Sequence, residues 1–353
     1  QGASAAMHSR APSFSEPGYS TLLTGAWPYL NDGPALNKDY EDIPTFTQDN
    51  LFSAVSRSGK KTAISAYYWF EKLVPQAAVN ARFYTPGDDR AADREVVDAA
   101  IKMLADPSTA LVLIHLDQVD YAGHHEGGPR DIQWNEAAAR ADGLLAEILA
   151  QLDLQKDTLL VVSDHGHIDQ GGHGGPDPAA LVEPFVLAGA GVKPGTYGDV
   201  NMVDVSPTAA VLLGAGLPAS TQGRVLSEML ALPAATLNKL SEATRAQQST
   251  LAQAYNNYIL RELKPFIDSK YRTLTGPQNT AFMGWSLGGL SAFYLVWQYP
   301  ADFGIVGAFS PSFWWRTNQN SLQELLASRV IHKLVRESPK RPGMKMWFEA
   351  GTA

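Results

Sequence analysis

The amino-acid sequence predicts an α/β protein with a mostly parallel sheet and helices on both faces. Three short apolar runs, at residues 61–67, 110–116 and 158–163, have the length and composition of buried parallel strands. Two segments with helical spacing of apolar residues, 93–105 and 132–152, lie between these runs along the chain. Strands that alternate with helices in this way favour a parallel sheet covered on both sides.

The remaining elements of the first part are short. Asp131 is expected to cap the helix that starts at residue 132. A further strand is expected at 184–188. A helix is expected at 206–214, because Pro207 would stand in its first turn, where proline is favoured. Asp204 is expected to cap this helix.

The last third of the chain has a different pattern. Residues 231–260 are rich in Ala, Gln and Asn and predict a helical tail or connector. From residue 261 the sequence again indicates an α/β segment, which extends to residue 353. Its expected elements are a strand, sharp turn and helix around 280–289, a strand region at 306–315, a helix at 321–337 and a strand at 344–348.

Composition excludes several classes of function. The 353 residues carry 28 basic and 36 acidic side chains, a formal net charge of −8, which argues against binding to a nucleic-acid backbone. No apolar run approaches the roughly 18–20 residues that a membrane span needs. There is no cysteine, so disulfides are excluded and any metal must bind nitrogen or oxygen ligands. The composition leaves the oligomeric state open.

Six of the eight histidines lie between His115 and His173, a concentration that core packing does not require. Asp120 and His124 follow one predicted strand, and Asp164-His165 follows another. In parallel sheets, ligands bind at the carboxyl ends of strands. Imidazole and carboxylate suit zinc or manganese, and three such ligands with an open position are typical of a catalytic site. The alternative is a set of capping aspartates and loop histidines.

The other histidines of this stretch carry weaker signals. His115 lies within an apolar strand and is expected to be a buried core residue. His167 lies near the expected pocket, and two roles stay open for it, contact with a substrate or support of the loop.

Several motifs together resemble the alkaline phosphatase superfamily, in particular its phosphodiesterase and nucleotide pyrophosphatase-like branch. The resemblance covers about residues 10–230, within a first domain at 1–230. The motifs that carry it are Asp120-Tyr-Ala-Gly-His124, Ser163-Asp-His-Gly166, Gly172-His-Gly174 and the runs at 184–195 and 203–214. It implies an alkaline phosphatase-like fold and a metal-dependent hydrolase of phosphate esters.

The resemblance also implies a nucleophile. The family has a Thr or Ser about ten residues before a Thr-Gly pair, and Ser15 stands in that position before Thr24-Gly25. Ser15 would attack phosphorus in line, and water would then hydrolyse the phosphoserine. The alternative for Ser15 is a helix-cap or turn serine beside Pro17.

The resemblance implies two divalent ions, with zinc expected and manganese as the alternative. Asp120, His124 and His173 would hold one ion. Asp164 and His165 would hold the second, which Ser15 would bridge.

One ligand of the family is not found in this sequence. The family supplies a further Asp to the second ion from a strand that precedes the nucleophile. Residues 1–14 contain no Asp or Glu and no predicted strand. We therefore expect the first strand of the domain to be missing and the second site to lack a ligand, as in a truncated or chimeric chain.

Gly284-Trp-Ser286-Leu-Gly288 is a G-x-S-x-G elbow between a predicted strand and helix. With the runs at 262–272 and 309–315 it resembles α/β-hydrolase esterases of the enterochelin-esterase type, over about residues 260–353. An elbow serine needs a histidine base and an acid. His332 is the only histidine after Ser286, in a helical pattern with charged neighbours, so this esterase triad is expected to be incomplete.

Three hypotheses follow for function. The first is the metal-dependent phosphoesterase, acting on a small-molecule monoester, diester, pyrophosphate, phosphonate or sulfate, with pocket residues from 28–90. The second is a serine carboxylesterase that uses Ser286 and is completed by a segment or partner outside this chain. The third is a non-catalytic metal-binding protein. Family resemblance favours an extracytoplasmic location.

Overall fold

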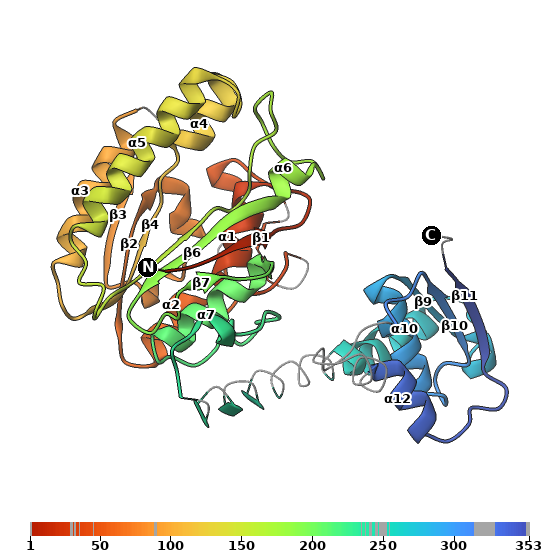
Figure 1. The fold of residues 1–353 in the computed structure, drawn as a ribbon. Coiled ribbons are helices and arrows are strands. Elements are labelled where there is room, and N and C mark those ends of the chain that lie inside the picture. The colour runs from red at the N-terminus through yellow and green to blue at the C-terminus, as the bar shows by residue number, and fades with distance from the viewer. Residues whose placement is uncertain are drawn as a thin grey trace. The chain divides into compact units, whose positions relative to one another are not determined.

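The computed structural model describes residues 2–350 except 29–30, 32, 35, 45, 88–89, scattered positions between 234 and 254, and 314–328. The chain divides into two compact units, residues 1–249 and 250–353, and each is described by itself. The predicted α/β class is confirmed, because both units combine helices with sheets (Figure 1).

Two sheets form the framework of residues 1–249. Their strands are β1 (Gly2–His8), β2 (Lys61–Tyr67), β3 (Ala81–Thr85), β4 (Thr109–Ile114), β5 (Thr158–Val162), β6 (Val182–Gly189), β7 (Gly195–Thr196) and β8 (Val200–Asn201). One sheet has the order β5-β6-β1-β7, with β8 also paired to β1, and β6 is antiparallel to both of its neighbours. The other sheet, β3-β2-β4, is parallel throughout.

Helices cover both faces of the parallel sheet. The helices of this unit are α1 (Ser15–Thr24), α2 (Leu51–Arg57), α3 (Ala92–Leu104), α4 (Gln118–His125), α5 (Ile132–Leu149), α6 (Pro178–Leu181) and α7 (Val205–Leu212). Successive side chains of β2 point to opposite faces. Ile64 packs with Leu23 of α1 and Phe52 of α2, whereas Ser65 Oγ donates a hydrogen bond to the carbonyl of Val96 in α3.

The predicted helices and strands of this unit agree with the structure to within three residues at either end. Residues 1–14 are the exception, since the expectation of no strand there is wrong. Strand β1 pairs with β6 along its whole length, and its Ala3 and Met7 are fully buried. The small residues of β1 have little preference for strands, so pairing with β6 and burial, not local propensity, determine its conformation.

Asp131 and Asp204 stand at the predicted N-cap positions of α5 and α7, but neither side chain forms the capping hydrogen bond. The Oδ2 atom of Asp131 accepts a hydrogen bond from the backbone N–H of Gly128, and the side chain does not cap α5. Asp204 accepts hydrogen bonds from the backbone N–H groups of Asn201 and Arg224 instead of capping α7. Each carboxylate therefore fixes a loop, because a nearby backbone N–H outside the helix binds it.

The second unit is a smaller α/β layer. Its strands β9 (Ala281–Trp285), β10 (Ile305–Phe309) and β11 (Lys345–Glu349) form a parallel sheet of order β11-β10-β9. Its helices are α9 (Lys264–Lys270), α10 (Leu287–Gln298) and α12 (Val330–Glu337). Phe293 of α10, Val306 of β10 and Ile331 of α12 share one core.

The predicted strand, turn and helix around 280–289 correspond to β9 and α10. Thirteen of the 30 residues of the predicted connector at 231–260 lie outside the described residues, as does the first half of the predicted helix at 321–337. No helix in the described part of the chain has both the length and the apolar character needed to cross a membrane.

Candidate metal centre

Helix α4 carries the first two predicted ligands. Asp120 lies in its first turn and His124 one turn later, with 3.5 Å between Asp120 Oδ2 and His124 Nε2. Residues four apart share one face of a helix. The start of α4 is fixed by the buried carboxylate of Asp93, which accepts hydrogen bonds from the backbone N–H groups of Asp117 and Gln118.

The loop between β5 and β6 carries the other predicted ligands. Asp164 and His165 follow β5 after one intervening residue, Ser163, and are buried. The loop folds back over α4, where the backbone N–H of Gly172 donates to the carbonyl of Gly123 at 3.1 Å. A β-carbon at Gly123 would lie 2.2 Å from the ring of His167, so α4 needs a glycine there for the loop to pack.

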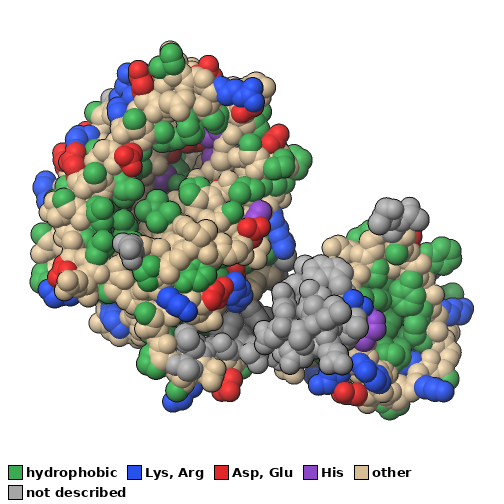
Figure 2. Space-filling model, viewed as in Figure 1, with side chains coloured by type: hydrophobic (Ala, Val, Ile, Leu, Met, Phe, Trp, Pro, Cys, Tyr) green, Lys and Arg blue, Asp and Glu red, His purple; other side chains and the backbone are tan. Residues whose placement is uncertain are grey.

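These two elements bring one carboxylate and four imidazoles together. Two overlapping groups have the spacing of metal ligands, Asp120 with His124 and His173, and Asp120 with His165 and His167. The ligand atoms of each group lie within 4.8 Å of one another. Figure 2 shows histidine and acidic side chains at the bottom of a hollow in this unit. The three residues predicted to hold the first ion therefore meet in space.

Backbone contacts determine which imidazole nitrogen faces the cluster. His173 Nδ1 donates to the carbonyl of Ser13 at 2.5 Å, and His165 Nδ1 donates to the carbonyl of Gly166 at 3.2 Å. In a neutral imidazole the other nitrogen then carries a free lone pair, which is the metal-binding form. Both histidines therefore present Nε2 as a ligand atom.

His167 has the opposite tautomer. Its Nδ1 accepts a hydrogen bond from the backbone N–H of Gly172 at 3.0 Å, so Nε2 carries the proton and donates to Asp120 Oδ1 at 2.7 Å. In this arrangement His167 orients the carboxylate of Asp120, a role that the sequence did not reveal. The available signal was the Asp-His-Gly-His order at 164–167, which places two imidazoles two residues apart.

The protonation states of the cluster suit a cation. Burial opposes ionisation of Asp120, but the hydrogen bond from His167 and the charges of neighbouring histidines lower its pKa to about 2. Burial, together with His165, lowers the pKa of His173 to about 4. An ionised carboxylate beside neutral imidazoles is the combination that binds a divalent metal.

Asp164 is the group that most clearly needs a partner. Its Oδ2 atom is buried, accepts no hydrogen bond and lies 3.2 Å from His165 Nε2. Burial and the negative charge of Asp120 raise the pKa of Asp164 to about 8. Two carboxylates and an unpaired buried oxygen at one place are stabilised by a bound cation. The residues present therefore fit a divalent metal centre.

Ser15 lies at the first position of α1, beside this cluster. Its Oγ is 3.1 Å from His165 Nε2. The close approach of α1 depends on Gly18, where a β-carbon would lie 2.8 Å from the carbonyl oxygen of Asp164. The amino end of a helix favours negative charge, so this position suits an ionised serine and a phosphoryl group.

His115 has a structural role, as predicted. It is buried, and its ring contacts those of Tyr19, Tyr67 and Phe70 at centroid distances of 5.0, 5.3 and 4.7 Å. Burial lowers its pKa to about 3, so the ring is neutral.

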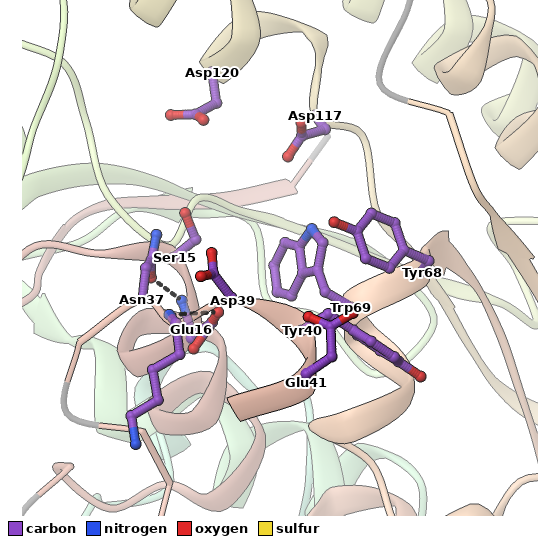
Figure 3. A pocket seen from close by; sticks show the side chains of 11 residues that line it. Ser15, Glu16, Asn37, Asp39, Tyr40, Glu41, Tyr68, Trp69, Asp117 and Asp120 are labelled. Carbon is purple, nitrogen blue, oxygen red and sulfur yellow. Dashed lines mark hydrogen bonds between the residues drawn. The ribbon is translucent and has the colours of Figure 1, made fainter. Parts of the chain in front are cut away.

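A cavity of about 460 Å³ opens beside Ser15 and Asp120. Figure 3 shows these two side chains facing each other at one end, with Trp69 and Tyr68 at the other. The remaining lining residues are Glu16, Asn37, Lys38, Asp39, Tyr40, Glu41 and Asp117. Apart from Ser15, Glu16 and the two aspartates after β4, they all lie within residues 28–90, where the pocket was expected.

Ser286, the second predicted nucleophile, lies in the other unit. Its φ of 53° and the tight contact of Gly284 with the backbone of Gly288 give the strained elbow that the motif predicts. Its Oγ lies 3.3 Å from Ser312 Oγ. Among the described residues, no imidazole or carboxylate forms a hydrogen bond with Ser286, and His332 is exposed on α12.

The fold and the cluster define an α/β unit with a candidate metal centre, and family models match both parts of the chain. Residues 1–174 match the model described as type I phosphodiesterase / nucleotide pyrophosphatase. Residues 237–353 match the model described as putative esterase.

Solved structures resemble the first part. Murine ectonucleotide pyrophosphatase / phosphodiesterase 5 is 14% identical with a TM-score of 0.53, over 65% of this chain and 92% of that chain. The alkaline phosphatase PafA is 12% identical with a TM-score of 0.52, over 65% and 92%. At these identities the likeness shows the fold alone, which is alkaline phosphatase-like.

Curated relatives share part of the sequence. The catalytic subunit of GPI ethanolamine phosphate transferase 3 of Homo sapiens is 27% identical over 247 residues, and that of Mus musculus is 25% identical over 242 residues. Each match covers 66% of this chain and 21% of the relative, so the chain spans about a fifth of the length of these proteins.

Proposed function

We propose that the first unit hydrolyses phosphate esters, with Ser15 as the nucleophile at a divalent-metal centre. The observation that carries the proposal is the position of Ser15 Oγ, 3.1 Å from the unprotonated Nε2 of His165 and beside the Asp120 cluster. The matches to phosphodiesterase and alkaline phosphatase folds support the same chemistry.

The proposed reaction has two displacements. Ser15 Oγ gives its proton to solvent water and forms a bond to phosphorus, while the bond from phosphorus to the leaving oxygen breaks and that oxygen takes up a proton from the solvent. Water then attacks the phosphoserine and gives up a proton, the bond between phosphorus and Oγ breaks, and Oγ takes up a proton to restore the serine hydroxyl. Bound divalent ions would lower the pKa of the serine and stabilise the negative charge that develops.

The protein groups have separate tasks in this scheme. The position of Ser15 Oγ, 3.1 Å from His165 Nε2, places the serine oxygen beside the ligand atoms of the cluster. Asp120, His124, His165 and His173 would hold the metal, with Asp164 as a further oxygen ligand, whereas His167 holds the Asp120 carboxylate in place. Nitrogen and oxygen donors favour zinc, and manganese is the alternative.

Transfer to an alcohol is the second candidate outcome of the same intermediate. The human and murine relatives are named as ethanolamine phosphate transferases, and an alcohol can attack a phosphoserine in place of water. We propose hydrolysis as the basal reaction because water is always available as the acceptor.

The test compares Ser15→Ala with Ser286→Ala, each purified, reconstituted with zinc and assayed with bis(4-nitrophenyl) phosphate. We expect Ser15→Ala to lose at least about a thousandfold in kcat/KM, since it lacks the nucleophile, and Ser286→Ala to equal the wild type. Elemental analysis should find the same zinc content in both variants. Full activity in Ser15→Ala, or loss in Ser286→Ala alone, would reject the proposal.

A further inference from the structure

The sheet of the second unit has one covered face and one outer face. Helices α10 and α12 pack against the covered face, where Val306 of β10 shares a core with Phe293 and Ile331. Successive side chains of a strand point to opposite faces, so the alternate residues of the three strands point away from this core. They form the outer face, which consists of Ala281, Met283, Trp285, Ile305, Gly307, Phe309, Lys345, Trp347 and Glu349.

The outer face is largely apolar and open to solvent. Met283 is 57% exposed, Trp285 65% and Trp347 68%, although the sheet is parallel throughout. Parallel sheets are normally covered on both faces, and exposed apolar patches commonly mark sites of association. Figure 2 shows hydrophobic side chains gathered on this unit. A partner that covers the outer face would remove this apolar surface from water.

A second copy of the same sheet fits the outer face by symmetry. Met283, Gly307 and Trp347 lie in one row across the sheet, each at the centre of its strand. We propose that two copies of this chain pack outer face to outer face about a two-fold axis along this row, an association that does not depend on the proposed function. Each strand then lies over its own copy in the opposite direction, and residues at equal distances on either side of the row meet.

The apolar residues that meet in this arrangement complement one another in size. Trp285 stacks on Phe309 with a ring-centroid distance of 4.8 Å. In the dimer Trp285 lies over Ala281 of the second copy, and Phe309 lies over Ile305 of the second copy. A larger side chain on one sheet therefore faces a smaller one on the other, which suits sheets that interdigitate about 10 Å apart.

The charges at the edge of the outer face are complementary as well. Lys345 and Glu349 are exposed and lie two residues on either side of Trp347, so each meets the opposite charge of the second copy. Among the described residues of this unit, the ion pair joins Lys264 to Asp268, and neither Lys345 nor Glu349 takes part in one. A shift of the sheets by two residues would place a charge against Trp347 instead. The two ion pairs therefore favour one register.

The apolar area sets the strength of the association. Large side chains bury about 150–250 Å² each, so the exposed parts of Met283, Trp285 and Trp347 amount to about 400 Å² per copy. With the rest of the outer face, two copies bury about 1,000–1,200 Å² in total, which is the lower limit for a specific interface. We therefore expect a reversible dimer with a dissociation constant in the micromolar range.

Sedimentation velocity of the full chain tests the interface. Between about 1 and 100 μM the sedimentation coefficient should rise from that of one chain to that of two. Met283→Asp places two unpaired carboxylates together on the axis, away from water, and should raise the dissociation constant at least about a hundredfold. Leu274→Asp is the matched control, since Leu274 is 77% exposed and lies outside the sheet. It should leave the dissociation constant unchanged.

An exchange of charges tests the orientation of the two copies. Lys345→Glu alone and Glu349→Lys alone each create two like-charge contacts per dimer and should raise the dissociation constant about tenfold. The double variant with both substitutions restores the two ion pairs and should return to within about twofold of the wild type. Both side chains are exposed, so the fold should be unchanged, which circular dichroism checks.

Two kinds of result would overturn the inference. The first is a chain that stays monomeric at all these concentrations. The second is a dimer that Met283→Asp does not weaken or that the double exchange does not restore, because its contact would then lie elsewhere. Monomeric variants should keep the zinc content and phosphodiester hydrolysis of the wild type. Failure of this inference would therefore leave the proposed function intact.

Discussion

The histidines of this region have different roles, and the contacts of each ring determine its role. His115 is surrounded by aromatic rings and stays neutral. His165 and His173 each donate from Nδ1 to a backbone carbonyl and so present a free Nε2. His167 receives a backbone N–H at Nδ1 and therefore donates to Asp120. Sequence spacing marked these residues as a group, but their tautomers depend on backbone groups that only the folded loop supplies.

Glu183 provides a prediction at the residue scale. It is 2% exposed, and Ser9 Oγ donates to its Oε1 at 2.6 Å while Oε2 has no partner. Burial raises its pKa from 4.5 to about 7, partly offset by the hydrogen bond from Ser9, and the charge of Asp164 raises it further. Because the folded state then holds a proton that the unfolded state has lost, the free energy of unfolding should fall as pH rises from 4.5 to 7.

Over this pH range the wild type should lose about 3 kcal/mol of its free energy of unfolding through Glu183. Glu183→Gln should abolish this part of the pH dependence. Urea unfolding of the chelator-treated protein at several pH values gives the difference between variant and wild type. Ser9→Ala is the opposite control, since loss of the hydrogen bond should steepen the dependence. Identical pH profiles for Glu183→Gln and the wild type would contradict the burial argument.

At the scale of elements, the packing of α4 against the loop between β5 and β6 depends on Gly123. An added β-carbon would lie 2.2 Å from the ring of His167, which must then move away from Asp120. Residues that orient a metal ligand typically contribute about 10- to 100-fold to metal affinity. We expect Gly123→Ala to weaken zinc binding by that factor, measured by calorimetric titration.

Gly143→Ala is the matched control for this change. Gly143 lies in α5, and no atom comes within 4 Å of its added β-carbon. This variant should bind zinc as the wild type does. Its free energy of unfolding should be higher by about 0.5–1 kcal/mol, because alanine favours a helix more than glycine does. Unchanged zinc affinity in Gly123→Ala would show that His167 does not position the centre.

The elements also show what the sequence could and could not predict. Strand β2 is buried at every residue after Lys61 and was predicted at its observed limits. Strand β1 is built of small residues and forms because β6 pairs with it, so no local pattern revealed it. The cavity was located only to residues 28–90, because the 3-10 turns η1 (Tyr40–Asp42) and η2 (Tyr68–Lys72) meet through tertiary contacts such as the hydrogen bond from the Tyr40 hydroxyl to Glu71.

At the scale of the whole molecule, the metal centre and the serine elbow belong to separate units. Ser15, Asp120 and the cavity lie within residues 1–249, and Ser286 lies within 250–353. In the described part of the chain, each hydrophobic core cluster contains residues of only one unit. A unit with its own core is expected to fold without the other.

We therefore predict that residues 1–249 alone retain the zinc content and the phosphodiesterase activity of the full chain to within about twofold, since no core contact or site residue is removed. Circular dichroism and thermal unfolding of the shortened chain establish that it is folded before zinc and 4-nitrophenol release are measured. Residues 250–353 alone are the control and should release no 4-nitrophenol from bis(4-nitrophenyl) phosphate. A folded 1–249 chain that binds zinc but lacks activity would show that the second unit contributes to the site, and the assignment of catalysis to Ser15 and its neighbours would then be incomplete.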